Sequence, residues 1–98
     1  MAARVARYGD KTDGRCRKGH YHEYGRIISG SLDVFINGKR AARYNDKVRA
    51  NCHHLAKINS GALDVFINGL KMARVGDHFY GSYKGLITSG SLDVFYGA

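Results

Sequence analysis

The sequence predicts a small all-β protein built from three copies of one repeat. A seven-residue phrase occurs three times with nearly the same letters, as SGSLDVF at residues 29–35, SGALDVF at 60–66 and SGSLDVF at 89–95. The first two copies continue into Ile-Asn-Gly, and Asn-Gly between extended segments is a strong sign of a tight β-hairpin. Glycine is abundant, at 13 residues, and proline is absent. These observations favour short strands joined by tight turns.

The composition limits the class of protein. The 98 residues are expected to form one domain over residues 1–98. No apolar run approaches the roughly 20 residues of a membrane helix, and no signal segment opens the chain, so synthesis in the cytoplasm is expected. The two cysteines are then expected to be free or metal-bound more often than disulfide-linked. A formal net charge of +8 favours polyanionic surfaces such as nucleic acid or lipopolysaccharide.

A second short pattern, Ala-Arg followed by two residues and Asp, also occurs three times. We interpret each Arg-x-x-Asp as a structural pair that closes a turn. The pairs are Arg7 with Asp10, Arg43 with Asp46, and Arg74 with Asp77.

Between each of these Asp residues and the next phrase lies a segment of variable length, at 11–26, 47–57 and 78–86. Variable length inside a regular repeat is typical of loops, so three loops are expected here. The segment Leu32–Ile36 that follows has aliphatic residues at alternate positions, which predicts a strand with one apolar face. Phe35, on the other face, is expected to lie against a partner or in a second small core, as are Phe66 and Phe95.

The two chain ends are expected to pair. The repeats supply three LDVF strands and three Ala-Arg strands, but only two Asn-Gly turns join them. Pairing of residues 4–8 with 92–96 would complete a third hairpin without a turn. The result would be a ring with approximate three-fold symmetry, with hairpin turns at one end and the variable segments at the other. Closure also removes exposed sheet edges.

The variable segments contain all five histidines and both cysteines. If the pseudo-symmetry gathers these segments, their imidazoles and thiols gather too, and such a donor set suits zinc. A metal would also stabilise so small a core. A Cys16–Cys52 disulfide and solvated histidines remain as alternatives, and His78, next to a repeated Asp, is expected to be a bystander. The residues concerned are Cys16, His20, His22, Cys52, His53, His54 and His78.

Catalysis is not expected. No glycine-rich loop follows a strand and opens a helix, and the repeated Asp33, Asp64 and Asp93 stand in identical contexts, which is more typical of structural carboxylates than of an acid–base pair. A basic nucleic-acid-binding β module is the alternative that the charge favours. No sequence signature of a known nucleic-acid-binding module accompanies the basic residues.

The whole cycle resembles the PAAR-repeat proteins. It reads Ala-Ala-Arg-x-x-Asp, a variable segment, and then Ile-x-x-Gly-Ser-x-x-Val-x-Ile-Asn-Gly, and it covers essentially the entire chain. The proline of the family motif is absent, since the central copy reads Arg40-Ala41-Ala42-Arg43. Because the chain is short, the likeness is greatest to the small spike-tip members found on the tails of T-even phages.

The resemblance implies a conical, non-enzymatic domain that acts as the tip of a membrane-puncturing spike. Its base would cap a trimeric β-helical spike protein in a contractile injection machine, either a phage tail or a type VI secretion system. One monomer would sit on one trimer, located in the virion after synthesis in the host cytoplasm. It would touch the bacterial outer membrane transiently, and no nucleic acid is expected as partner. The apex would hold a zinc ion, with iron possible, on His20, His22, Cys52 and His54, with His53 as the alternative to His54.

Overall fold

The computed structural model describes residues 3–17 and 21–96, and every element within them is a β-strand. None of these residues belongs to a helix that is long and apolar enough to cross a membrane. The strands, in chain order, are β1 (Ala3–Arg4), β2 (Lys11–Cys16), β3 (His22–Ile27), β4 (Phe35–Ile36), β5 (Lys39–Arg40), β6 (Lys47–Ala50), β7 (Leu55–Ile58), β8 (Phe66–Ile67), β9 (Leu70–Lys71), β10 (His78–Gly81), β11 (Tyr83–Ile87) and β12 (Phe95–Tyr96).

Six of these strands close into a narrow barrel in the order β10-β11-β2-β3-β6-β7. Along β6 and β7 exposed and buried residues alternate, as expected for strands with one face toward a core. The barrel interior is filled by a cluster of buried side chains from all three repeats. Its largest members are Ile27, Val48, Ile58, Phe79, Tyr83 and Ile87.

The barrel corrects one expectation, because the variable segments are β-hairpins and not loops. β2 with β3, β6 with β7, and β10 with β11 each form an antiparallel pair inside them. Glycines hide this in the sequence. Gly14 and Gly85 are paired across β2 and β11, and a Cβ on Gly85 would lie 2.1 Å from the Asp13 carbonyl oxygen. The barrel is so narrow that these positions tolerate no side chain, so glycine here belongs to strands.

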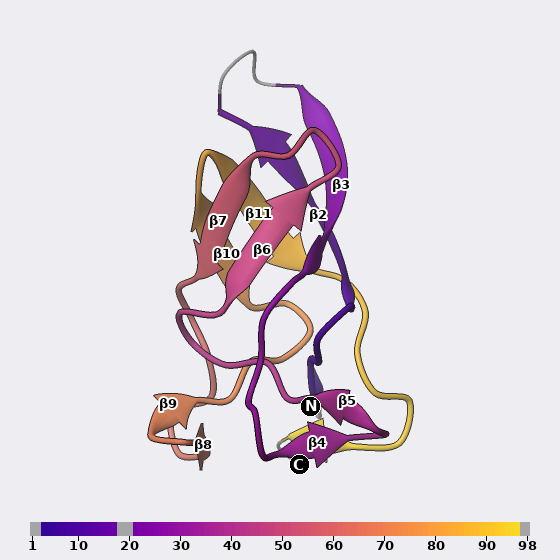
Figure 1. The fold of residues 1–98 in the computed structure, drawn as a ribbon, viewed down its shortest axis with the longest axis vertical. Coiled ribbons are helices and arrows are strands. Elements are labelled where there is room, and N and C mark those ends of the chain that lie inside the picture. The colour runs from indigo at the N-terminus through magenta and orange to yellow at the C-terminus, as the bar shows by residue number, and fades with distance from the viewer. Residues whose placement is uncertain (1–2, 18–20, 97–98) are drawn as a thin grey trace.

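Below the barrel lie three short two-stranded units, drawn at the foot of Figure 1. The turns of β4–β5 and β8–β9 have positive φ at both Asn-Gly residues, for example 54° at Asn37 and 76° at Gly38. The predicted hairpin turns are therefore confirmed.

The third unit is β1 paired with β12, and it confirms the predicted pairing of the chain ends. Ala3 pairs with Tyr96 and Arg4 with Phe95. This register repeats that of the covalent hairpin, in which Ile36 pairs with Lys39 and Phe35 with Arg40. The ring is thus completed by hydrogen bonding where a turn is missing.

The three repeats meet at three alanines on the pseudo-three-fold axis. The N–H of Ala6 donates to the carbonyl of Ala73, Ala73 donates to Ala42, and Ala42 donates to Ala6, each at 3.0 Å. All three are fully buried. A closed ring of three backbone hydrogen bonds leaves no room for a larger side chain, which explains the repeated alanine.

The phrase Leu32–Ile36 is not a full strand, contrary to expectation. Only Phe35 and Ile36 belong to β4, and Leu32 is 77% exposed. The hydroxyl of Ser31 accepts hydrogen bonds from the backbone N–H groups of Asp33, at 3.3 Å, and Val34, at 3.0 Å. These bonds turn the backbone before the strand begins, so Leu32 projects outward.

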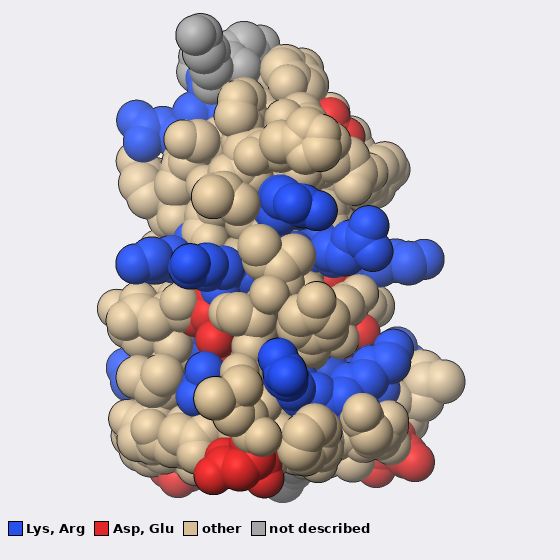
Figure 2. Space-filling model, in the orientation of Figure 1, with Lys and Arg blue, Asp and Glu red and all other residues tan. Residues whose placement is uncertain are grey.

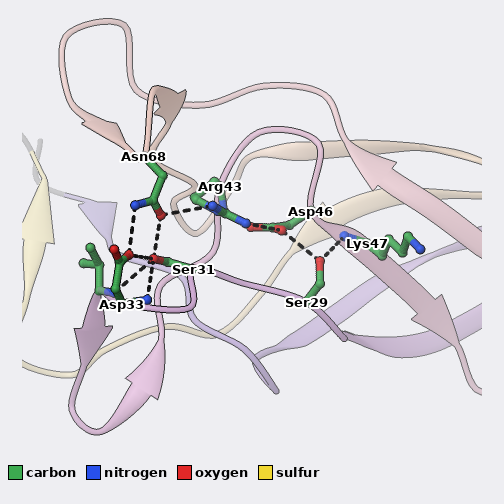
Figure 3. A network of polar contacts seen from close by, with 8 residues as sticks. Ser29, Ser31, Asp33, Arg43, Asp46, Lys47 and Asn68 are labelled. Atoms are coloured by element: carbon green, nitrogen blue, oxygen red, sulfur yellow. Dashed lines mark hydrogen bonds and ion pairs between the residues drawn. The ribbon is translucent and has the colours of Figure 1, made fainter.

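The Arg-x-x-Asp pairs do close turns, and they also connect repeats (Figure 3). Arg43 Nε lies 3.0 Å from Asp46 Oδ2, and Arg43 Nη1 donates to Asn68 Oδ1 of the following hairpin at 3.0 Å. The same Asp46 accepts the hydroxyl of Ser29 at 2.8 Å. Equivalent ion pairs join Arg7 to Asp10 and Arg74 to Asp77.

Candidate functional site

The base of the molecule presents an exposed apolar face with three-fold repetition. Leu32, Leu63 and Leu92 are 77–79% exposed, and the three equivalent valines are each 37% exposed. The equivalent phenylalanines are 51–55% exposed. The sequence predicts that they lie either against a partner or in a second small core, and this exposure excludes the core. These exposed side chains of the three base units are together named the base face, and they are Leu32, Val34, Phe35, Leu63, Val65, Phe66, Leu92, Val94 and Phe95. Large exposed apolar side chains that gather on a surface are typical of protein interfaces.

Hydrogen bonds hold the carboxylates of the base in place. Asp33 accepts from the amide of Asn68 at 2.9 Å and from the hydroxyl of Ser31 at 2.9 Å, and these bonds lower its pKa. Asn37 does the same for Asp93, whose pKa is also lowered. Such bonds favour the charged form of a carboxyl group.

The third position of the base differs, because no Asn-Gly turn exists there. Asp64 instead accepts the phenol hydroxyl of Tyr96, and this bond raises the pKa of Tyr96. The repeats are therefore not identical copies. Where an Asn-Gly turn is present, its asparagine donates to the carboxylate, and where the turn is missing, the hydroxyl of Tyr96 donates instead.

At the opposite end, the barrel brings two thiols and one imidazole together. Cys16 ends β2, whereas Cys52 and His54 lie in the turn between β6 and β7. Cys16 Sγ lies 2.6 Å from Cys52 Sγ, and Cys52 Sγ lies 3.5 Å from His54 Nδ1. The three donor atoms are all within 4.8 Å of one another. Both cysteines are free thiols in this structure.

The two thiols differ in their surroundings. Cys16 is fully buried, and burial, with the hydrogen bond to Cys52, raises the pKa of its thiol. Burial also acts against ionisation of Cys52, but hydrogen bonds from Cys16, from the His54 backbone and from the phenol of Tyr21 outweigh it and lower its pKa. Tyr21 thus contacts both sulfur atoms, and these bonds raise the pKa of its own hydroxyl.

The structure brings together two of the four predicted ligands, Cys52 and His54. His22 lies outside this group, since its Nε2 is hydrogen-bonded to Asp13 and its ring packs edge-on against Tyr24. His20 lies outside the described residues.

The other candidates of the sequence also lie apart from this group. His53 is exposed, with a positive φ of 74°, and His78 is exposed and opposite Leu86. Cys16, which the sequence left without a settled role, belongs to the group. Once residues 11–16 are recognised as a strand, Thr12 and Cys16 fall on the same, inward face of β2. This alternation is the signal in the sequence that places the Cys16 thiol inside the barrel.

Comparison with known families supports the repeat. A family model described as the PAAR motif matches residues 1–53 and 20–80, which is most of the chain. The chain belongs to the PAAR-motif family. No curated protein matches it.

Membership in the PAAR-motif family implies a spike-tip role in a contractile injection machine and a structural rather than enzymatic protein. The missing proline does not disturb the PAAR architecture here. Arg40 occupies its place in the central copy, lies in β5, and pairs with Phe35. The alanines that follow, Ala41 and Ala42, are fully buried.

The donor set at the apex of this PAAR domain fits a transition metal. Thiolate and imidazole ligands at short mutual distances suit zinc or iron. Cys16, Cys52 and His54 would hold the ion, and it would link β2 to the β6–β7 turn. The phenol of Tyr21 would hydrogen-bond to the ligand sulfurs, an arrangement that orients metal ligands in many proteins.

Proposed function

We propose that this chain, residues 1–98 acting as one PAAR domain, is the sharpened tip of the puncturing spike of a contractile injection machine. Its base face docks on the blunt end of a trimeric β-helical spike protein, one monomer on one trimer. The observation that carries this is the three-fold repetition of the base face, whose equivalent side chains have nearly equal exposure. A surface repeated about an axis satisfies three identical chains at once.

The rest of the molecule suits puncturing. The six barrel strands form a closed sheet, so this part of the chain has no free edge. At the apex, a bound metal would join two hairpins and resist their separation under load. We propose zinc as that metal, with iron as the alternative. Its ligands are Cys52 and His54, joined by Cys16, and His20 is the fourth donor. We leave out His22, because Asp13 holds its imidazole outside the group.

The machine we propose is a phage tail, with this protein in the virion at the end of the baseplate spike after synthesis in the host cytoplasm. A type VI secretion system is the alternative machine. Contact with the bacterial outer membrane would be transient.

Capture by a trimeric β-helical spike end, immobilised through its other end, tests the docking. Wild-type protein is expected to bind, and Leu63→Asp to lose most binding, because a charge would be buried in the interface. Ser82→Asp, an exposed change of the same charge at the β10–β11 turn, is the control. Salt-sensitive binding to duplex DNA, without spike capture, would instead support the basic nucleic-acid-binding module.

A further inference from the structure

The outer surface of the barrel carries two arginines that face each other across the β3–β6 seam. Arg26 and Arg49 are directly opposite in the register, and both are exposed. Within residues 3–17 and 21–96, neither guanidinium has a hydrogen bond or an ion pair with a protein group. Like charges directly opposite on adjacent strands destabilise a sheet. The presence of both arginines at this pair of positions therefore calls for a reason other than stability.

The cationic row extends further along the barrel. Lys11 on β2 is directly opposite Arg26, so three positive side chains lie side by side across three strands. Figure 2 shows bands of Lys and Arg across the middle and the lower part of the molecule, while Asp and Glu lie mostly toward the base, with some near the upper end. Asp10 and Asp46, which directly precede β2 and β6, are engaged elsewhere, since they are paired with Arg7 and Arg43.

Two adjoining hollows open at this row. A small one of about 90 Å³ is lined by Arg26, Arg49, Ala50, Asn51 and His53. A larger one of about 460 Å³ shares Arg26 and Asn51 with it. The remaining residues that line the larger hollow are Gly9, Lys11, Thr12, Tyr24, Gly25 and Thr88.

We propose that these two hollows, named here the seam site, bind a phosphorylated sugar of an outer-membrane glycolipid. The phosphate would lie in the small hollow between Arg26 and Arg49, because planar guanidinium groups bind phosphate oxygens in pairs. The sugar would lie in the larger hollow against the ring of Tyr24, which is 59% exposed. The volume of that hollow falls in the range of small-molecule sites.

The identity of the ligand follows from the shape and charge of the site. The small hollow has room for one tetrahedral oxyanion and is bounded by Asn51 and His53, which suits a terminal phosphate monoester better than the continuous diester chain of a nucleic acid. The choice of a membrane glycolipid as the source rests on the proposed function, since a spike tip meets that surface first.

Vesicle binding tests the seam site. Phosphatidylcholine vesicles with diphosphoryl lipid A are compared with phosphatidylcholine alone, with free glucosamine phosphate and with a duplex DNA. Wild-type protein is expected to sediment with the lipid A vesicles and not with phosphatidylcholine alone. Free glucosamine phosphate is expected to compete for this binding, because it carries the same phosphorylated sugar. The double variant Arg26→Gln, Arg49→Gln is expected to bind them about tenfold more weakly, as charge-assisted bonds to phosphate are lost.

The matched control is Lys57→Gln, Lys84→Gln, which removes the same charge from exposed positions elsewhere on the barrel. Equal losses in both variants would show general charge attraction and overturn the seam site, as would tighter binding to DNA than to vesicles. Thermal melting of each variant checks the fold. Spike capture by the same proteins separates the two proposals, because capture without lipid A binding removes only the seam site.

Discussion

At the scale of single residues, the pseudo-three-fold axis and the apex of the molecule differ in their chemistry. The axis needs the smallest side chains, since Ala6, Ala42 and Ala73 exchange backbone hydrogen bonds in a closed ring. The apex instead gathers donor atoms that could hold a metal ion, on Cys52, His54 and the buried thiol of Cys16. Packing therefore explains the repeated motif, whereas the candidate metal donors come from the parts of the chain in which the repeats differ.

Replacement of Cys52 tests the apex. Cys52→Ser removes a thiolate that would join β2 to the β6–β7 turn, so the metal content of purified protein is expected to fall to about a tenth or less of the wild-type value. The melting temperature is expected to fall too, and to become insensitive to a chelator. Elemental analysis and thermal melting measure both effects. His78→Ala, at an exposed histidine outside the group, is the control. An unchanged metal content in Cys52→Ser would exclude Cys52 as a ligand.

Asn68 links stability to pH through Asp33. The hydrogen bond from the Asn68 side-chain amide, together with that from the Ser31 hydroxyl, holds the pKa of Asp33 in the folded state below the ordinary carboxyl value. The resulting stability is present above the unfolded pKa, about 4, and is lost as pH falls through the folded pKa. Asn68→Gly keeps a residue suited to positive φ but removes the amide. The variant is therefore expected to lose less stability than wild type when the pH is lowered from about 6 to about 3.

Chemical unfolding at several pH values measures this difference. Asn45→Gly is the matched control, because Asn45 also has a positive φ, 75°, and is exposed. It is expected to keep the wild-type slope with pH. Parallel pH profiles for wild type and Asn68→Gly would contradict the role given to the amide.

At the scale of elements, the narrow barrel depends on strands that approach closely at glycine. A methyl group on Gly85 would lie 2.1 Å from the Asp13 carbonyl oxygen, so Gly85→Ala is expected to lower the free energy of unfolding by about 2–4 kcal/mol. Gly76→Ala separates this clash from backbone strain, because Gly76 has a φ of 94° and open space around it. It is expected to cost about 1 kcal/mol. Denaturant unfolding compares the two, and equal losses would contradict the close approach at Gly85.

The sequence predicts some elements well and hides others. The Asn-Gly turns are predictable because they depend on local turn chemistry. The paired chain ends are predictable because the repeats supply one more pair of strands than there are turns to join them. The barrel hairpins are not, since the segment KTDGRC of β2 has few apolar residues and a glycine that resembles a turn. The outward direction of Leu32 is hidden too, because a single hydroxyl, that of Ser31, turns the chain. At the candidate site, Cys52 and His54 follow from the resemblance to the PAAR-repeat proteins, whereas Cys16 becomes evident only once β2 is known.

At the scale of the whole molecule, one chain imitates a trimer, and the missing third turn makes this testable. The β1–β12 pair has the register of the β4–β5 hairpin, so Tyr96 and Ala3 stand where Ile36 and Lys39 stand around an Asn-Gly turn. A permuted chain can therefore join Tyr96 to Ala3 through Asn-Gly and open between Asn37 and Gly38. The three base units would then exchange roles.

We expect this permuted chain to fold, because it closes one hairpin covalently and opens an equivalent one whose strands can pair without a turn, as β1 and β12 do. Its melting temperature is expected to lie within about 10 °C of wild type, since a change of about 1 kcal/mol shifts the melting temperature of so small a domain by roughly 4–8 °C. Circular dichroism and thermal melting measure this. As a control, cutting the wild-type chain between Phe79 and Tyr80, within barrel strand β10, should abolish folding. Failure of the permuted chain to fold, with the register unchanged, would show that the three base units are not interchangeable.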